Sequence, residues 1–140
     1  MKKEVFKYTE LSTLTNDDEI VFATYVPRLE ITLDVAQELV KNRILFAQNR
    51  PHYTLIDFTN VKAVTKEARD YMNSPEGGLK GLLGGAFLSN NVVATLFINL
   101  FLKVWKPTIP ARFFTTREDA LEWLIKIKSE QLRYAQPINV

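Results

Sequence analysis

The sequence predicts a single α/β domain with a mixed, mostly parallel sheet flanked by helices, in the element order ββαβαβαβα. The chain has 140 residues, of which 46% are hydrophobic and 24% charged, as in an ordinary globular domain with a buried core. Short runs of β-branched and aromatic residues alternate with segments of helical spacing. Strands that alternate with helices imply parallel pairing, because a crossover connects two parallel strands.

The N-terminal part predicts a β-hairpin. Residues 4–11 (EVFKYTEL) and 19–26 (EIVFATYV) are the expected strands, and Asn16-Asp17-Asp18 between them is typical of a turn. The first strand alternates polar and apolar residues, as an edge strand does, whereas the second is apolar on both faces, as a central strand is. We therefore expect residues 4–11 to form an antiparallel edge of the sheet.

The middle of the chain predicts a helix, a strand and a second helix. Residues 31–49 have apolar side chains at helical spacing, with Thr32 or Asp34 as the N-cap. Residues 52–60 are a short apolar run, which predicts a buried parallel strand. Residues 65–73 predict a short helix that begins after a capping threonine and has an acid in its first turn.

The second half predicts strands at 85–90 and 111–115 and helices at 91–105 and 116–133. The last helix has a Thr-x-x-acid capping box, which is either Thr115–Glu118 or Thr116–Asp119. We expect one domain over residues 1–140, with its core at residues 20–127 and a C-terminal tail at 129–140.

All five glycines lie between Gly77 and Gly85. A phosphate-binding loop follows a strand and opens a helix, whereas this segment follows a helix and leads into a strand. Neither G-x-G-x-x-G nor the P-loop motif occurs. We interpret the segment as a crossover loop. The alternative is a mobile lid, because Leu79, Leu82 and Leu83 could cover a pocket or a partner surface.

The composition argues against several classes of protein. The net charge is only +2 and the basic residues are scattered, so we do not expect nucleic-acid binding. Without cysteine and with one histidine, the chain offers no disulfide and no transition-metal site. The N-terminus lacks the apolar region of a signal peptide, and no apolar run reaches the ~20 residues of a membrane span. We expect a cytoplasmic protein with no transmembrane segment.

No set of residues predicts catalysis. His52 stands at the amino end of its strand, about 17 Å of extended chain from Asp57, whereas functional groups in such sheets gather at the carboxyl ends. We interpret His52 as a residue of the strand entry. Asp57 is the one acid in an apolar strand, and we expect it to accept hydrogen bonds from backbone amides of the following loop. We therefore expect no enzyme, no metal and no cofactor.

The expected helix at residues 91–105 is apolar around most of its circumference, with aromatic side chains at Phe97, Phe101 and Trp105. A helix that flanks a sheet usually has a narrower apolar face. The excess apolar surface could be buried within the monomer, or covered by the loop leucines, a second subunit, another protein or a lipid-like ligand.

Two segments resemble the STAS superfamily of anti-sigma-factor antagonists and its SpoIIAA-like relatives. Residues 53–68 are similar to the STAS strand-loop-helix, with matches at Asp57, Val61 and Val64. Residues 92–124 are similar to the C-terminal part of the SpoIIAA-like relatives. The residues that carry this second match are Arg112, Phe113, Phe114, Ala120, Leu121, Trp123 and Leu124. Together the resemblance covers residues 20–127 and implies a SpoIIAA/STAS-like fold.

The chain departs from the antagonists at their phosphorylatable serine. They have Asp-Ser-Ser-Gly at the helix start, where this sequence has Thr65-Lys66-Glu67-Ala68. A phosphorylation switch is therefore unsupported. Thr65 could accept a phosphate at a helix start, but a role as N-cap already explains this residue.

These observations predict a non-catalytic regulatory or protein-interaction module that forms a homodimer. The expected partner surface combines Asp57, Thr59 and Thr65 with the loop leucines Leu79, Leu82 and Leu83. The alternative function is a carrier or peripheral binder of a small apolar or lipid-like ligand. In that case Phe97, Phe101 and Trp105 would line the pocket.

Overall fold

The computed structural model describes residues 5–17, 19–90 and 109–135. Its strands are β1 (Val5–Tyr8), β2 (Ser12–Asp17), β3 (Ile20–Tyr25), β4 (Leu29–Ile31), β5 (His52–Asp57), β6 (Val61–Val64), β7 (Leu82–Leu88) and β8 (Ala111–Phe114). Its helices are α1 (Leu33–Phe46), α2 (Lys66–Met72) and α4 (Arg117–Ala135).

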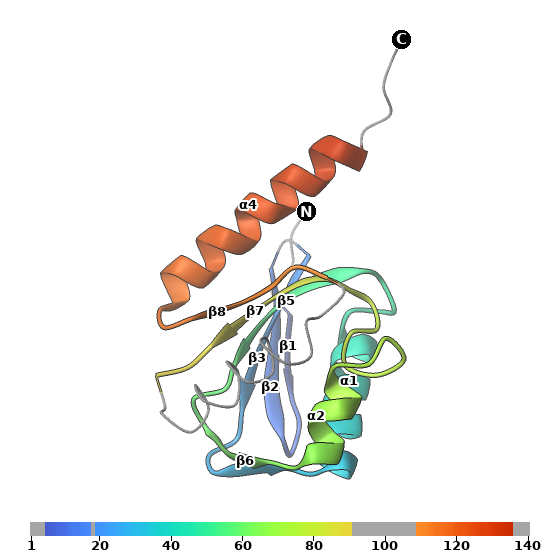
Figure 1. Cartoon of the computed structure of the whole chain (residues 1–140), viewed down its shortest axis with the longest axis vertical. Helices are drawn as coiled ribbons and strands as arrows, with labels where there is room; N and C mark the ends of the chain where they lie inside the picture. The colour runs from blue at the N-terminus through green and yellow to red at the C-terminus, as the bar shows by residue number, and fades with distance from the viewer. Residues whose placement is uncertain (1–4, 18, 91–108, 136–140) are drawn as a thin grey trace.

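A six-stranded sheet in the order β1-β2-β3-β5-β7-β8 forms the centre of the fold (Figure 1). The pairs β1–β2 and β2–β3 are antiparallel. The pairs β3–β5, β5–β7 and β7–β8 are parallel. This confirms the predicted fold class, a mixed sheet that is mostly parallel and has an antiparallel N-terminal edge.

The predicted N-terminal hairpin is wrong, because three strands form a meander there. Residues 12–17, which lie between the two expected strands and include Asn16 and Asp17 of the expected turn, are strand β2, and the first strand covers only Val5–Tyr8. Leu14 of β2 is 2% exposed, and its burial against the core stabilises the extended conformation of this segment. The polar residues around Leu14 make the segment look like a turn in the sequence. The reversal lies after Asp17, where Glu19 has a φ of 67° in the left-handed region.

A second, two-stranded parallel sheet of β4 and β6 was not predicted. Leu29 and Ile31 of β4 are buried, as is Val61 of β6. The amide of Thr65 donates to the carbonyl of Ile31 at 3.0 Å. This small sheet therefore connects the starts of α1 and α2.

The three helices within the described residues cover both faces of the large sheet. Helices α1 and α2 lie on one side and α4 lies on the other (Figure 1). Strand β3 contributes side chains to the cores on both faces of the sheet. Its residues Val21 and Ala23 belong to the core under α1 and α2, whereas Ile20 and Phe22 belong to the core under α4. The alternation has the two-residue period of a strand buried on both faces.

Threonine side chains cap the helices as the sequence predicts. The Oγ1 of Thr32 accepts from the amide of Val35 at 3.4 Å, and that of Thr65 accepts from the amide of Ala68 at 3.2 Å. At α4, Thr116 is the residue whose Oγ1 accepts, from the amide of Asp119 at 3.2 Å. Of the two capping threonines considered, the structure therefore shows Thr116 as the N-cap.

Helix α4 continues through the segment expected as a tail and ends at Ala135. It projects past the sheet in Figure 1. Gln131 attaches this outer part to the domain, because its side chain accepts from the Tyr53 hydroxyl and donates to the Leu83 carbonyl at 3.3 Å. An ion pair of 3.2 Å between Lys128 and Glu19 adds a second attachment.

Candidate functional site

A cavity of about 50 Å³ lies between the sheet and the layer of α1 and α2. Apolar side chains form most of its wall, together with three side chains that can donate hydrogen bonds. The residues that line it are Ser12, Leu14, Ala23, Tyr25, Ala36, Leu39, Val40, Arg43, Ile56, Phe58, Met72, Gly78, Leu79, Leu82 and Phe87. Cavities with apolar walls and a few convergent polar groups are the usual form of ligand sites.

Arg43 is the central polar residue of this cavity. It is 5% exposed, although it belongs to α1 and arginine is almost never fully buried without a partner. Its Nε donates to Nε2 of His52 at 3.2 Å. Its two terminal nitrogens donate to the carbonyls of Gly78 at 3.0 Å and Lys80 at 2.7 Å. One guanidinium thus connects α1, the start of β5 and the glycine-rich loop.

The hydrogen bonds fix the tautomer of His52. Because Arg43 has only donors, Nε2 of His52 must be the acceptor, so the proton is on Nδ1. That nitrogen donates to the carbonyl of Arg50 at 2.8 Å. Burial lowers the pKa of His52, and the charge of Arg43 lowers it further, while the hydrogen bond to the Arg50 carbonyl acts in the opposite direction.

Burial also perturbs Tyr25 and Arg43, the two titratable residues that line the cavity. It lowers the pKa of Arg43 to about 10, although the nearby Tyr25 and Tyr71 favour the charged form. Burial raises the pKa of Tyr25, and the charge of Arg43 opposes this rise. At neutral pH, Tyr25 and His52 are therefore uncharged and Arg43 is a cation.

The glycine-rich loop packs closely against the end of α2. A Cβ at Gly78 would overlap the carbonyl oxygen of Met72, and a Cβ at Gly77 would overlap that of Tyr71. Gly81 has a φ of +77°, which side chains other than glycine rarely adopt. The loop is therefore a close-packed connection from α2 to β7, tied to α1 by Arg43.

The structure divides the three loop leucines between two sides of the domain. Leu79 and Leu82 are buried and line the cavity. Leu83 follows Leu82 in strand β7, so it points to the opposite face, and it is 37% exposed. Leu79 and Leu82 thus do not lie on an accessible partner surface. They form part of the wall of a pocket, and covering a pocket was one of the two roles considered for a lid formed by this loop.

The other predicted surface residues are Asp57, Thr59 and Thr65, which lie on the segment from the end of β5 to the start of α2. The Asp57 carboxylate accepts from the amide of Thr59 at 2.9 Å, which confirms the expected contact with the following loop. Thr65 is exposed at the start of α2. Strand β6 separates it from Asp57 and Thr59 by about 13 Å of extended chain.

The segment at residues 91–108 lies outside the described residues. The expected apolar helix and its side chains Phe97, Phe101 and Trp105 fall in this segment.

Ser12, Tyr25 and Arg43 were not predicted from the sequence as residues of a binding site. A signal was present for Arg43, because it continues the row of α1 residues that the fold buries, Ala36, Leu39 and Val40. A charged residue in the apolar stripe of an amphipathic helix is typical of a buried polar contact. Tyr25 carried no such signal, since aromatic residues are common in strands.

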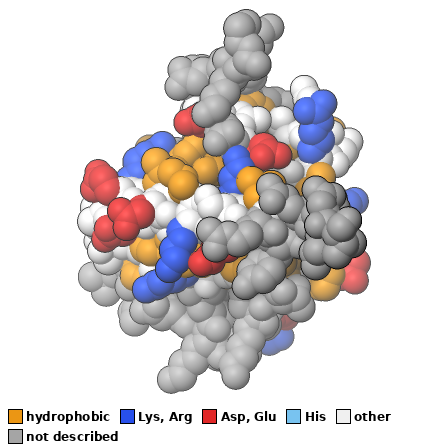
Figure 2. Space-filling model, turned by 90° about the horizontal axis from the view of Figure 1, so that it is seen from above, with side chains coloured by type: hydrophobic (Ala, Val, Ile, Leu, Met, Phe, Trp, Pro, Cys, Tyr) orange, Lys and Arg blue, Asp and Glu red, His pale blue; other side chains and the backbone are white. Residues whose placement is uncertain are grey.

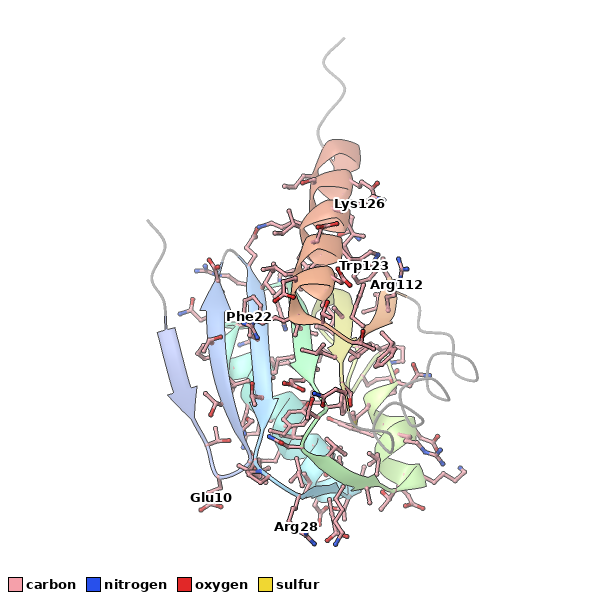
Figure 3. The ribbon with its side chains drawn as sticks, turned by 90° about the vertical axis from the view of Figure 1, so that its left-hand side faces the viewer. Glu10, Phe22, Arg28, Arg112, Trp123 and Lys126 are labelled. Atoms are coloured by element: carbon pink, nitrogen blue, oxygen red, sulfur yellow. The ribbon has the colours of Figure 1, made fainter. Side chains whose placement is uncertain are left out.

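Helix α4 presents apolar side chains to solvent. Ile125 is 52% exposed and Leu132 is 56% exposed, while Ala120, Leu124 and Ile127 are buried against the sheet. On the face seen from above, hydrophobic side chains lie among acidic and basic ones (Figure 2). Trp123 of α4 and Arg112 of β8 lie on the same side of the domain, with Lys126 farther along the helix (Figure 3).

Within residues 5–17, 19–90 and 109–135, no three His, Cys, Asp or Glu side chains are placed to hold a metal ion. No helix in these ranges has the length and apolar character needed to cross a bilayer.

The sheet order and the helix layers define an α/β domain with a mixed, mostly parallel sheet. The solved structure of an uncharacterised protein of the DUF3478 family from Shewanella loihica PV-4, described as having a SpoIIAA-like fold, superposes on this chain with a TM-score of 0.56. The match covers 87% of this chain and 92% of the other at 16% sequence identity, so it shows the fold.

The family is shown by a match over residues 14–128. This chain belongs to the family described as "Domain of unknown function (DUF7793)". A comparison with curated proteins finds no match.

Proposed function

We propose that this protein is a non-catalytic interaction module of the cytoplasm that forms a homodimer through α4. The observation that carries the proposal is the exposure of Ile125 and Leu132 on a helix that projects past the sheet (Figure 1). These side chains stand seven positions apart, on one side of the helix, with the half-buried Leu121 in the same row. Such a row is suited to packing against another helix.

The charges of α4 favour a second copy in antiparallel orientation as the occupant. Residues 117–125 contain three acids and one arginine, whereas residues 126–135 contain three basic residues and one acid. In a two-fold pair, each acidic half would lie beside the basic half of the partner helix. Complementary charges of this kind fix the register and orientation of an interface.

Two matched variants test the proposal. Ile125→Glu puts a carboxylate at the two-fold contact, and we expect a monomer that remains folded because the side chain is already exposed. Leu45→Glu is the control, since Leu45 is 51% exposed on α1, on the other side of the sheet. Sedimentation velocity should show a dimer for the wild type and for Leu45→Glu. If Ile125→Glu and Leu45→Glu formed dimers to the same extent, α4 would not be the dimer interface.

A regulatory partner would bind elsewhere on the domain. The segment from Asp57 to Thr65 corresponds to the strand-loop-helix that resembles STAS domains. Asp57, Thr59 and Thr65 remain our proposed contact residues there, with Leu83 as a separate exposed residue on the α4 face. Lys62 is exposed between Thr59 and Thr65, so we include it in this proposed contact surface, and Lys62→Ala should weaken binding of a partner protein without changing the dimer.

A second candidate function is the binding of a small ligand, which the cavity around Arg43 favours. Its volume of about 50 Å³ is too small for a lipid chain. A ligand of this cavity would therefore be smaller than a lipid, whereas the lipid-like ligand expected from the sequence was assigned to Phe97, Phe101 and Trp105, which lie outside the described residues.

A further inference from the structure

We propose that the cavity beside Arg43 binds a short-chain carboxylate, with the carboxylate paired to the guanidinium and the hydrocarbon part held by the apolar wall. This inference rests on the second candidate function and adds the chemical class of the ligand. It is independent of dimer formation through α4.

The first argument is the missing counter-ion. All three protein acceptors of Arg43 are uncharged, namely His52 and the carbonyls of Gly78 and Lys80. Among the described residues no carboxylate contacts this buried guanidinium. Burying a cation costs free energy unless an anion or a full set of hydrogen bonds compensates it. An anionic ligand would provide that compensation.

The second argument is the supply of free donors. A guanidinium has five N–H groups, and three of those of Arg43 are used in the hydrogen bonds above. The remaining two have no acceptor in the part of the chain that the structure describes. Arginine binds carboxylates well because its fork of donors matches their two oxygens.

Two hydroxyl groups can complete the polar end of the site. Ser12 and Tyr25 are cross-strand partners in the β2–β3 pair, and both line the cavity with Arg43. Tyr25 keeps its proton, since burial raises its pKa, and its hydroxyl can therefore donate to an anion. No residue of the wall is an Asp or a Glu, so the wall presents no negative charge to an anion.

The rest of the wall sets the size and character of the ligand. Leu14, Ala23, Leu39 and Ile56 provide an apolar surface that would exclude a second charge. A water molecule needs roughly 10–15 Å³ of such volume, so a cavity of about 50 Å³ holds only a few non-hydrogen atoms. Propionate fits this description, whereas a dicarboxylate or a long fatty acid does not.

Sodium propionate and propionamide form the test pair on the wild-type protein. The two molecules are nearly the same in shape, but only propionate has a charge. We expect saturable propionate binding with a dissociation constant on the order of 1 mM by calorimetry. We also expect a shift of the Arg43 Nε–H signal in NMR spectra, and at least tenfold weaker binding of propionamide.

The variants locate the site. Arg43→Gln retains a donor for the loop carbonyls but removes the charge, and it should lose propionate binding. If Arg43→Gln does not fold, Tyr25→Phe replaces it, because this change removes only one hydroxyl and should weaken binding severalfold.

Three outcomes separate the possible errors. Equal binding of propionate and propionamide would overturn the charge pairing and keep the small-ligand function. No binding of either molecule at 50 mM would overturn the inference and the second candidate function together. If propionate shifted only the NMR signals of exposed arginines such as Arg112, the assignment of the binding site to the cavity beside Arg43 would be wrong. Sedimentation of the wild type reports on the dimer separately in every case.

Discussion

Arg43 and His52 are joined by a hydrogen bond of 3.2 Å in which the guanidinium donates to a neutral imidazole. The two residues come from different elements, α1 and the start of β5, and both are buried. The same guanidinium holds two carbonyls of the glycine-rich loop. This contact therefore couples helix packing, the strand entry and the wall of the cavity.

Removal of Arg43 should destabilise the protein. In Arg43→Met, the acceptors at His52, Gly78 and Lys80 lose their donor. Each unsatisfied acceptor costs about 1–3 kcal/mol, and relief from burying a charge offsets part of this. We expect the free energy of unfolding in urea to fall by about 2–4 kcal/mol. Lys41→Met is the matched control on the same helix, because Lys41 is exposed, and it should change stability little.

Stability should fall as the pH is lowered below the ordinary pKa of His52. The unfolded chain takes up this proton near pH 6.5, whereas the folded protein takes it up only at lower pH. Between these two values the unfolded state binds more protons, so the free energy of unfolding decreases as the pH falls. The slope for one group is at most about 1.4 kcal/mol per pH unit.

The chain has one histidine, so the effect can be assigned. Urea unfolding at several values between pH 5 and pH 7 measures it. His52→Gln keeps an acceptor for Arg43 without titrating, and it should flatten the dependence in this window. An unchanged slope in this variant would mean that His52 is not the group responsible.

Close packing at Gly78 predicts a large cost for one added methyl group. In Gly78→Ala the Cβ would overlap the backbone of Met72, which cannot move without shifting the end of α2. We expect a loss of about 2–4 kcal/mol, as for other strained or overpacked sites. Gly85→Ala is the comparison, since its Cβ would meet the end of the Phe87 ring at 3.3 Å, a contact that a side chain can relieve. Similar thermal unfolding of the two variants would contradict this account.

The cap at Thr65 predicts a graded effect of substitution. Thr65→Ala removes the oxygen that accepts from the amide of Ala68 and should cost about 1 kcal/mol. Thr65→Ser keeps that oxygen and should retain most of the stability. If Thr65 also contacts a partner protein, Thr65→Ser will weaken partner binding without a matching loss in thermal stability.

Local chemistry explains which elements the sequence could predict. The capping threonines Thr32 and Thr65 act within three residues of themselves, so their roles follow from the sequence. The parallel core strand β5 was also predictable, because Tyr53, Leu55 and Ile56 form a short apolar stretch of the kind found in buried parallel strands. By contrast, β4 and β6 have only three and four residues, which is too short for a periodic pattern.

The cavity could not be predicted from the sequence, because it is formed by contacts between residues that are distant along the chain. Arg43 is far along the chain from Gly78 and Lys80, and only the fold brings them together. Leu82 and Leu83 are neighbours of the same chemical type, and their separation between the cavity and the solvent depends on the pleat of β7. The segment at 12–17 was misread because its Asn and Asp residues are typical of turns, while its burial depends on pairing with β3.

Native mass spectrometry of the purified wild-type protein tests the central claim most directly. The claim is that α4 is the interface of a symmetric homodimer, with Ile125 at its two-fold contact. The account predicts a species of twice the chain mass of 16.1 kDa at micromolar concentration, and a single chain mass for Ile125→Glu. A wild-type protein that is monomeric at the same concentration would contradict it.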